Sequence, residues 1–137
     1  MKVFYQVDKG GYKPTKAHDQ DAGFDLYAPE DYKADRTIID TKVHIMVPSG
    51  HVGLVLPRSS MTKNGFITHT GVIDAGYTGT IKIKLDYQGV DREVHYYAGQ
   101  RIAQLVIVPI PEVELIEYDV ASMHTARGAG AFGSSGK

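Results

Sequence analysis

The sequence predicts an all-β protein of the sandwich or barrel kind, because its apolar residues repeat with a period of two and almost nowhere with the period of a helix. The clearest case is the segment 80–87, in which Ile81, Ile83, Leu85 and Tyr87 fall on one face of a half-buried strand. Glycine and proline separate this run from similar short runs before and after it. Such spacing favours strands joined by turns over alternating strands and helices.

The individual elements follow from these runs in chain order. Strands are expected at residues 3–7, 24–28, 43–47, 52–56, 80–87, 93–96, 103–108 and 113–118. One helical turn or two is expected at residues 59–63, directly after Pro57. From Ala121 the chain becomes rich in glycine and serine. We therefore expect one β domain over residues 1–120 and a flexible C-terminal arm over residues 121–137.

Length, charge and cysteine content exclude several classes of protein. A chain of 137 residues and 15.0 kDa is the size of one domain. Its formal net charge of −1 offers no surplus for direct nucleic-acid binding. The absence of cysteine removes disulfides, thiolate zinc sites and cysteine nucleophiles, and the scattered histidines predict no zinc. Without an apolar run of ~20 residues or a signal-peptide core, we expect a cytoplasmic protein that does not enter membranes.

Two loops carry residues suited to chemistry. Arg58, Ser59 and Ser60 follow an expected strand and could cradle an anion, although a surface arginine beside a serine helix cap is an equally ordinary reading. Asp74 follows an apolar stretch and precedes Gly76 and Tyr77. This carboxylate could be a catalytic base, or it could be an aspartate in a hairpin turn followed by a core tyrosine.

The C-terminal arm is the third candidate. Residues 127–137 hold four glycines, two serines and a single aromatic residue, Phe132. A frayed tail is one interpretation. An arm that orders on a ligand or on a neighbouring subunit is the other, with backbone amides wrapped around phosphates. The segment lacks the Gly-Lys-Ser/Thr sequence of a Walker loop. Together, the three segments suit a nucleoside polyphosphate.

Five segments in order resemble the five motifs of the trimeric deoxyuridine triphosphatase (dUTPase) family. They are residues 22–26, 57–60, 71–77, 99–104 and 127–136. The resemblance implies a distorted jelly-roll barrel of the β-clip, dUTPase-like type, assembled as a homotrimer with exchanged C-terminal arms. It also implies that each active site lies between subunits and is closed by an arm.

The resemblance implies hydrolysis of dUTP to dUMP and pyrophosphate, by attack of water at the α-phosphorus. Asp74 matches the base that orients and deprotonates the water. Mg²⁺ would be held mainly by the substrate phosphates, and Asp25 matches a position that acts on it through water. Such an enzyme keeps uracil out of DNA and supplies dUMP for thymidylate synthesis.

The remaining matches concern substrate binding. Tyr77 matches the residue that packs under the deoxyribose and excludes a 2′-hydroxyl, and Phe132 matches the aromatic residue that stacks on uracil. The hairpin at residues 66–72 would read the uracil edge through its main chain. The matched base and sugar positions are Thr68, Gly71, Val72, Ile73, Tyr77 and Phe132, with Lys82 on the substrate side. The matched phosphate positions are Arg58, Ser59, Ser60, Gln104, Arg127, Gly133, Ser134 and Ser135.

Two positions depart from the family pattern. Thr68 stands where many members carry asparagine, so main-chain groups would carry more of the base recognition. Ala131 stands where glycine is usual, and at a position with positive φ this would cost on the order of 1 kcal/mol.

Two other functions remain as alternatives. A dCTP deaminase shares the fold but needs a glutamate on the strand after residues 71–77, where this chain has Lys84. A cation cannot serve as that proton shuttle. A catalytically idle binding or regulatory module is the second alternative, and the intact Asp74, Arg58 and arm disfavour it. A regulatory protein partner alongside catalysis is compatible with the sequence.

Overall fold

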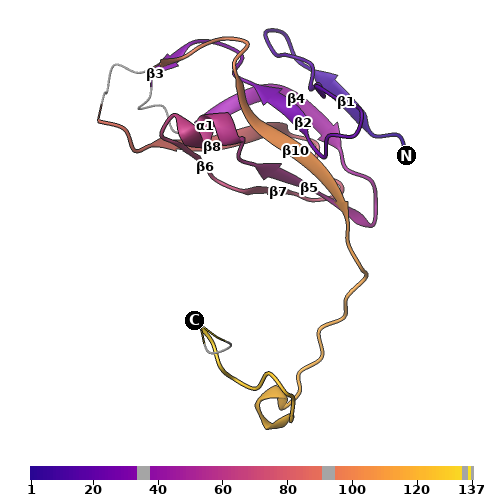
Figure 1. Cartoon of the computed structure of the whole chain (residues 1–137). Coiled ribbons are helices and arrows are strands. Elements are labelled where there is room, and N and C mark those ends of the chain that lie inside the picture. Colours follow the sequence, from indigo (N-terminus) through magenta and orange to yellow (C-terminus); the bar gives the residue numbers. More distant parts are fainter. Residues whose placement is uncertain (34–37, 91–94, 134–135, 137) are drawn as a thin grey trace.

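The computed structural model describes residues 1–33, 38–90, 95–133 and 136. Its barrel is made of two four-stranded antiparallel sheets, in the orders β1-β4-β8-β6 and β2-β10-β5-β7, with a small two-stranded sheet β3-β9 at one end (Figure 1). The protein is therefore a distorted jelly-roll barrel, as expected. Its elements are β1 (Phe4–Val7), β2 (Phe24–Tyr27), β3 (Tyr32–Lys33), β4 (Ile38–Met46), β5 (His51–Leu56), α1 (Ser59–Lys63), β6 (Phe66–Thr68), β7 (Gly71–Ile73), β8 (Thr80–Tyr87), β9 (His95–Tyr96), β10 (Arg101–Pro109) and the 3₁₀ turn η1 (Val120–Ser122).

The alternating strand behaves as its pattern predicts. In β8, Ile81, Ile83 and Leu85 are 2% exposed or less, while Lys82 and Lys84 face outward. These residues join a core to which both sheets contribute, including Leu105 from β10. Burial of each such aliphatic side chain contributes about 1.5–3 kcal/mol. The core fixes which face of β8 is presented to the surface.

Most of the other expected elements are confirmed, with shifted ends. The expected helical turn is α1. Of the short strand expected at residues 93–96, the structure describes residues 95 and 96, which form β9; residues 93 and 94 lie outside the described residues. Strand β4 begins earlier than residue 43, where the sequence placed it, because Ile39 and Thr41 continue the buried face of the strand. A bulge between Asp40 and His44 shifts its register with β8. At this bulge, Lys42 has a φ of 64° and donates its backbone N–H to Asp40.

The strand expected at residues 113–118 is wrong for the single chain. Beyond Pro109 the chain leaves the barrel as an extended arm, and residues 111–133 are exposed (Figure 1). The Ile110 amide still donates to the carbonyl of Gly50, but the hydrogen bonds of the described residues beyond Ile110 stay within the arm. Alternation alone cannot make a strand, because a strand also needs a neighbouring strand to bond with.

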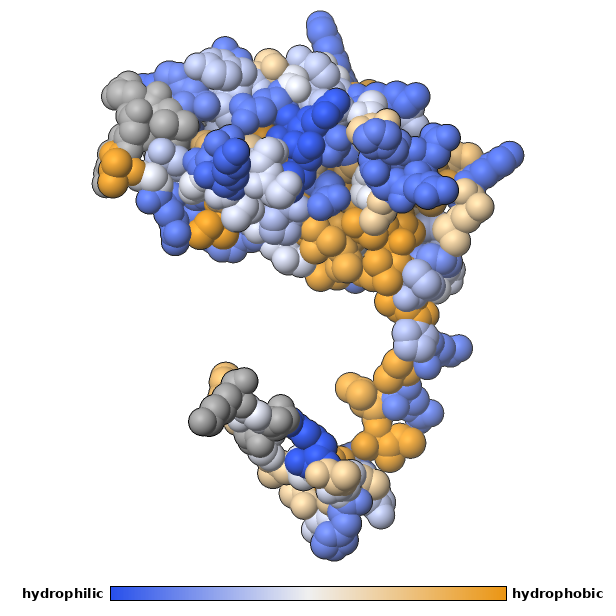
Figure 2. Space-filling model, in the orientation of Figure 1, coloured by the Kyte–Doolittle hydropathy of each residue, from blue (hydrophilic) through white to orange (hydrophobic). Residues whose placement is uncertain are grey.

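The outer face of the sheet β2-β10-β5-β7 is unusually apolar. Val106 on β10 lies opposite Leu54 on β5, which in turn lies opposite Val72 on β7, and Val72 is 65% exposed. Figure 2 shows the corresponding apolar patch low on the barrel, beside the point where the arm leaves. An antiparallel sheet with one face in water normally carries polar residues on that face. Strands that are apolar on both faces indicate that both faces become buried.

Candidate active site

The first part of the site is a cavity of about 280 Å³ beside the end of β7. It brings together six of the residues that the sequence predicted: Gly71, Val72, Ile73, Asp74, Tyr77 and Lys82. Asp74 follows directly on β7, whose pairing with β5 fixes the direction in which the chain enters the turn. A carboxylate, a tyrosine ring and the main chain of a short strand therefore share one pocket.

The turn between β7 and β8 has a backbone that two glycines make possible. Gly76 has a φ of 91°, and the N–H of Tyr77 then donates to the carbonyl of Asp74 at 3.2 Å. The Tyr77 hydroxyl donates to the carbonyl of Thr80 at 2.9 Å. A Cβ at Gly79 would overlap the Tyr77 ring. The turn thus holds the tyrosine ring over the entry of β8, within the cavity of Asp74.

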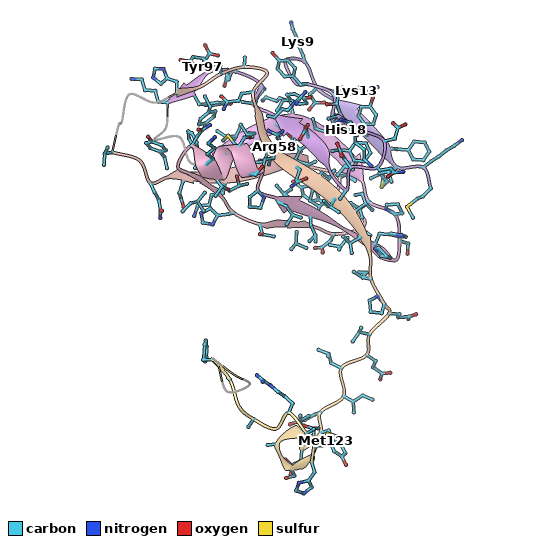
Figure 3. All side chains as sticks on the ribbon, in the orientation of Figure 1. Lys9, Lys13, His18, Arg58, Tyr97 and Met123 are labelled. Atoms are coloured by element: carbon cyan, nitrogen blue, oxygen red, sulfur yellow. The ribbon has the colours of Figure 1, made fainter. Side chains whose placement is uncertain are left out.

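The second part of the site is a cluster of charges around Asp25 on β2. The Arg58 Nε donates to Asp25 Oδ1 at 2.8 Å, and the Arg101 Nε lies 3.5 Å from Asp25 Oδ2. The Asp25 side chain is 13% exposed and that of Arg58 24%. Figure 3 shows Arg58 where the chain enters α1. Hydrogen bonding and charge interaction with Tyr27, followed by the charge of Asp25, raise the pKa of Arg101, so this cluster carries two permanent cations and one carboxylate.

Asp25, Arg58, Ser59 and Gln104 line a shared polar cavity of about 290 Å³. Gln104 lies opposite Asp25 in the β10–β2 pairing, and its Nε2 donates to the carbonyl of Pro57 at 2.8 Å. Gly23 permits this placement, since a Cβ there would lie 2.5 Å from Gln104 Oε1. The Ser60 hydroxyl accepts from Arg58 Nη1 at 3.1 Å. Of the predicted phosphate-binding residues, those of the barrel are thus assembled next to Asp25: Arg58, Ser59, Ser60 and Gln104.

Two further predicted residues of the barrel, Thr68 and Lys82, lie in different surroundings. Thr68 is 5% exposed and donates its hydroxyl to the carbonyl of Ile102 at 3.4 Å, so its side chain points into the core and does not line the cavity of Asp74. Lys82 lines that cavity and donates to the Thr80 hydroxyl at 3.2 Å. The side chain of Thr68 is therefore not among the groups that line this cavity, and residues 66–72, expected as a hairpin, are two strands of different sheets, because β6 pairs with β8 and β7 pairs with β5.

The predicted arm residues lie away from both cavities. Phe132 is fully exposed, and Arg127 and Gly133 are exposed as well. Figure 3 shows the arm, with Met123 labelled, standing clear of the barrel. Ser134 and Ser135, also predicted to bind substrate, lie outside the described residues. Within one chain, the arm is not assembled with the rest of the predicted site.

Sequence reasoning missed several residues of the site. Val55, Thr80 and Ile81 complete the lining of the Asp74 cavity, and Arg101 is the second cation beside Asp25. Arg101 belongs to the matched segment 99–104, but the sequence analysis assigned it no role of its own. Its role depends on the β10–β2 register, which the local pattern does not encode.

The side chains around Asp25 suit a metal ion whose other ligands come from a bound substrate. Among the described residues, no three side chains of His, Cys, Asp or Glu converge to hold a metal ion. Asp25 is a single carboxylate shared between two arginines. Mg²⁺ is commonly held by one or two carboxylates together with substrate phosphates, and Asp25 fits that arrangement.

Among the described residues, no helix has the length and apolarity to cross a membrane.

Comparison with known proteins identifies the class to which this fold and site belong. The dUTPase family model matches residues 11–136. The deoxyuridine 5'-triphosphate nucleotidohydrolase of Tropheryma whipplei strain Twist is 42% identical over 135 residues, covering 94% of this chain and 92% of the relative. The enzyme of the same name from Mycobacterium tuberculosis strain H37Rv is also 42% identical, over 141 residues, with 96% and 92% covered.

Solved structures of dUTPases share the fold of this chain. A dUTPase mutant of Staphylococcus bacteriophage 80alpha with dUpNHpp superposes with a TM-score of 0.89 at 29% identity, covering 99% of each chain. A dUTPase of phage phi11 of S. aureus, described with a structural Mg(II) ion, gives a TM-score of 0.77 at 26% identity, with 87% and 97% covered. The chain belongs to the dUTPase family. It is a nucleotide hydrolase, a dUTP diphosphatase, and its substrate is dUTP.

Proposed function

We propose that the protein hydrolyses dUTP to dUMP and pyrophosphate by attack of water at the α-phosphorus, with Asp74 as the base. The observation that carries this proposal is the shared cavity of Asp74, Tyr77 and the β7 main chain. Tyr77 would lie under the deoxyribose, and the main chain of β7 would bind the uracil edge. Asp74 would then face the innermost phosphate, where orienting and deprotonating a water is worth on the order of 10²–10⁴ in rate.

The phosphates would bind at the cluster of Arg58, Ser59 and Gln104. A guanidinium and two neighbouring hydroxyls offer charge-assisted hydrogen bonds to phosphate oxygens. Bound Mg²⁺ would neutralise charge that develops on the departing pyrophosphate. Asp25 would orient that ion through its water, and Ser59 would lie near the leaving group. Positioning and charge neutralisation then account for most of the catalysis.

We further propose that one active site is built by more than one copy of the chain, in a homotrimer. Among the described residues, the cavity of Asp74 and the cavity of Asp25 share no lining residue. The arm that carries Arg127 and Phe132 reaches neither of them in its own chain. The apolar outer face at Leu54, Val72 and Val106 supplies a surface that assembly would bury. Each site would then combine base-binding, phosphate-binding and arm residues of different copies.

The cellular consequences are part of the same proposal. Removal of dUTP would keep uracil out of DNA, and the dUMP produced would supply thymidylate synthesis. The cytoplasmic location expected from the sequence stays a prediction, as does the possibility of a regulatory protein partner. Neither changes the chemistry assigned to the site.

The test is a pyrophosphate-release assay with Mg²⁺ that compares dUTP, UTP, dTTP and dCTP. We expect turnover of dUTP and rejection of the other three nucleotides, because each would leave a polar group unpaired or overlap the pocket. Ammonia release from dCTP would instead support the deaminase alternative. Turnover of UTP as fast as that of dUTP would contradict the position given to Tyr77.

A further inference from the structure

We propose that His44 is a positioning residue for the loop that carries Asp74 and Tyr77, and that it ties this loop to Asp8 by hydrogen bonds from both ring nitrogens only when its imidazole is protonated. The inference rests on the proposed function, because that loop supplies the proposed base and the proposed sugar platform. It concerns a residue outside all five motifs.

His44 lies on β4, between β1 and β8, and β8 is the strand into which the loop leads. On β4 it lies opposite Gln6 of β1 on one side and opposite Thr80 of β8 on the other. Its neighbours Val43 and Ile45 are buried, so the imidazole faces outward, where its side chain is 29% exposed. The bulge that ends at His44 sets this orientation.

Both ring nitrogens of His44 face oxygen acceptors. Nε2 lies 2.8 Å from Asp8 Oδ2, and Nδ1 lies 2.7 Å from the main-chain oxygen of Thr78. A carboxylate and a carbonyl can only accept hydrogen bonds. Neutral imidazole has one N–H, whereas imidazolium has two. Only the cation can satisfy both oxygens, and the neutral ring must direct a lone pair at one of them.

The bond to Thr78 acts on the site through the adjacent tyrosine. Tyr77 lines the cavity of Asp74, and together with Thr78 and His44 it also lines a second cavity of about 340 Å³ on the other side of the loop. Its amide is bonded to the carbonyl of Asp74. A displaced Thr78 carbonyl would therefore shift the tyrosine ring and the turn that presents Asp74.

The surroundings decide the pH range of this attachment. The charged groups that face His44 are Asp8 beyond β1, Asp40 and Lys42 on β4, and Lys82 on β8. The bond to the Thr78 carbonyl, followed by the bond to Asp8, raises the pKa of His44 above 6.5. The two-sided attachment is thus complete below about pH 6.5, and one of its two hydrogen bonds is lost as pH rises through the higher pKa of the folded protein. The pKa of Asp8 is lowered by the bond to His44, so its carboxylate stays charged over this range.

The first test is an NMR titration that does not depend on activity. In the full-length protein, the amide signals of Tyr77, Thr78 and Gly79 should follow the His44 ring signals with one midpoint above pH 6.5. In His44→Gln this pH dependence should vanish, and in Asp8→Asn the midpoint should fall. His51→Gln is the matched control, because the His51 ring bonds to the carbonyl of Ser49, two residues away, and not to the loop of Asp74 and Tyr77. Loop amides that ignore the titration of His44, or that respond unchanged in His44→Gln, would overturn the proposal.

The second test separates positioning from folding. As pH rises through the same midpoint, the KM of the wild-type protein for dUTP should increase about two- to fivefold, the size of effect typical of an exposed ionic contact. His44→Gln should show the higher KM at every pH, while the melting temperature changes little. A KM without this step in the wild type would sink the inference even if dUTP is hydrolysed. If dUTP is not hydrolysed at all, the proposed function fails, and the titration still decides whether His44 holds the loop.

Discussion

The guanidinium of Arg58 and the carboxylate of Asp25 form an ion pair of 2.8 Å that joins the start of α1 to strand β2. The two residues are 33 positions apart in the sequence, 58 against 25. Arg101 approaches the same carboxylate from β10. One acidic side chain thus holds two cations at the place where phosphate oxygens would bind. In the complex proposed above, the oxygens of a triphosphate would compete with Asp25 for Arg58 and so would free the carboxylate for the water shell of Mg²⁺.

Replacement of Asp25 tests both roles of this residue. Asp25→Asn leaves two guanidinium groups without their shared counter-ion, so we expect a loss of about 1–3 kcal/mol in the free energy of unfolding. Stimulation of activity by Mg²⁺ should weaken at the same time. Asp21→Asn is the matched control, since Asp21 lines the same cavity but bonds to the exposed His18. Equal Mg²⁺ dependence in Asp25→Asn and in the wild type would remove the assigned role.

The sequence predicted correctly those elements whose structure depends on residues close together in the chain. The alternation over β8 and the helical turn α1 are found where they were expected, because side-chain burial and the start after Pro57 act within a few residues. Resemblance to family motifs located Asp74, Arg58 and Gln104, and the fold brings each of them to a cavity.

The features that the sequence did not predict depend on contacts between residues that are far apart in the sequence. The bulge at Lys42 requires the pairing of β4 with β8, and the role of Arg101 requires the β10–β2 register. Residues 113–118 alternate like a strand, but no strand among the described residues pairs with them. Thr68 was expected near the base, yet the tight β6–β8 pairing turns its hydroxyl toward the carbonyl of Ile102. In each case, the deciding contact lies far away in sequence.

Removal of the proposed base should abolish turnover without unfolding the protein. Asp74→Asn keeps the size of the side chain and the main-chain turn, so dUTP should still bind. Pyrophosphate release should fall on the order of 10²–10⁴-fold. Asp31→Asn serves as the control, because Asp31 accepts a hydrogen bond from the Ala98 amide and lines neither cavity. Turnover near the wild-type rate in Asp74→Asn would require another base.

A charge on the apolar face of the β5–β10 sheet should prevent assembly. Val106→Lys would place an ammonium group opposite Leu54, where burial of the charge is costly. We expect light scattering to give the mass of one chain for this variant and of three chains for the wild type. The matched control is Val90→Lys, because Val90 is fully exposed on the barrel. A wild-type protein with the mass of one chain would contradict the trimer.

The contact between the β6–β7 connection and β8 should depend on pH through Asp86. The His69 Nε2 lies 2.5 Å from Asp86 Oδ2, and this hydrogen bond holds the pKa of Asp86 below its ordinary value of 3.8. The bond therefore adds stability above that ordinary value, and the gain is lost as pH falls through the lower pKa of the folded protein. Thermal melts should show Asp86→Asn as slightly less stable than the wild type at neutral pH and equally stable in strong acid. A difference that grows on acidification would contradict this assignment.

The C-terminal arm should matter for catalysis and not for folding. A chain that ends at Ala126 lacks Arg127 and Phe132 but keeps every strand of the barrel. We expect its melting temperature and its assembly to match those of the full chain. Its kcat/KM for dUTP should fall on the order of 10²–10³-fold, because contacts that neutralise phosphate charge in the transition state are removed.

Two single substitutions divide this loss between the ends of the substrate. Phe132→Ala should mainly raise KM, because stacking on a base contributes about 1–3 kcal/mol and the ring makes no contact with its own barrel. Arg127→Ala should mainly lower kcat, because its charge would act on the phosphates.

Ala131→Gly restores the residue that the family usually has there, and it should leave both constants close to those of the wild type or improve them. A truncated chain with full activity would show that the arm does not close the site.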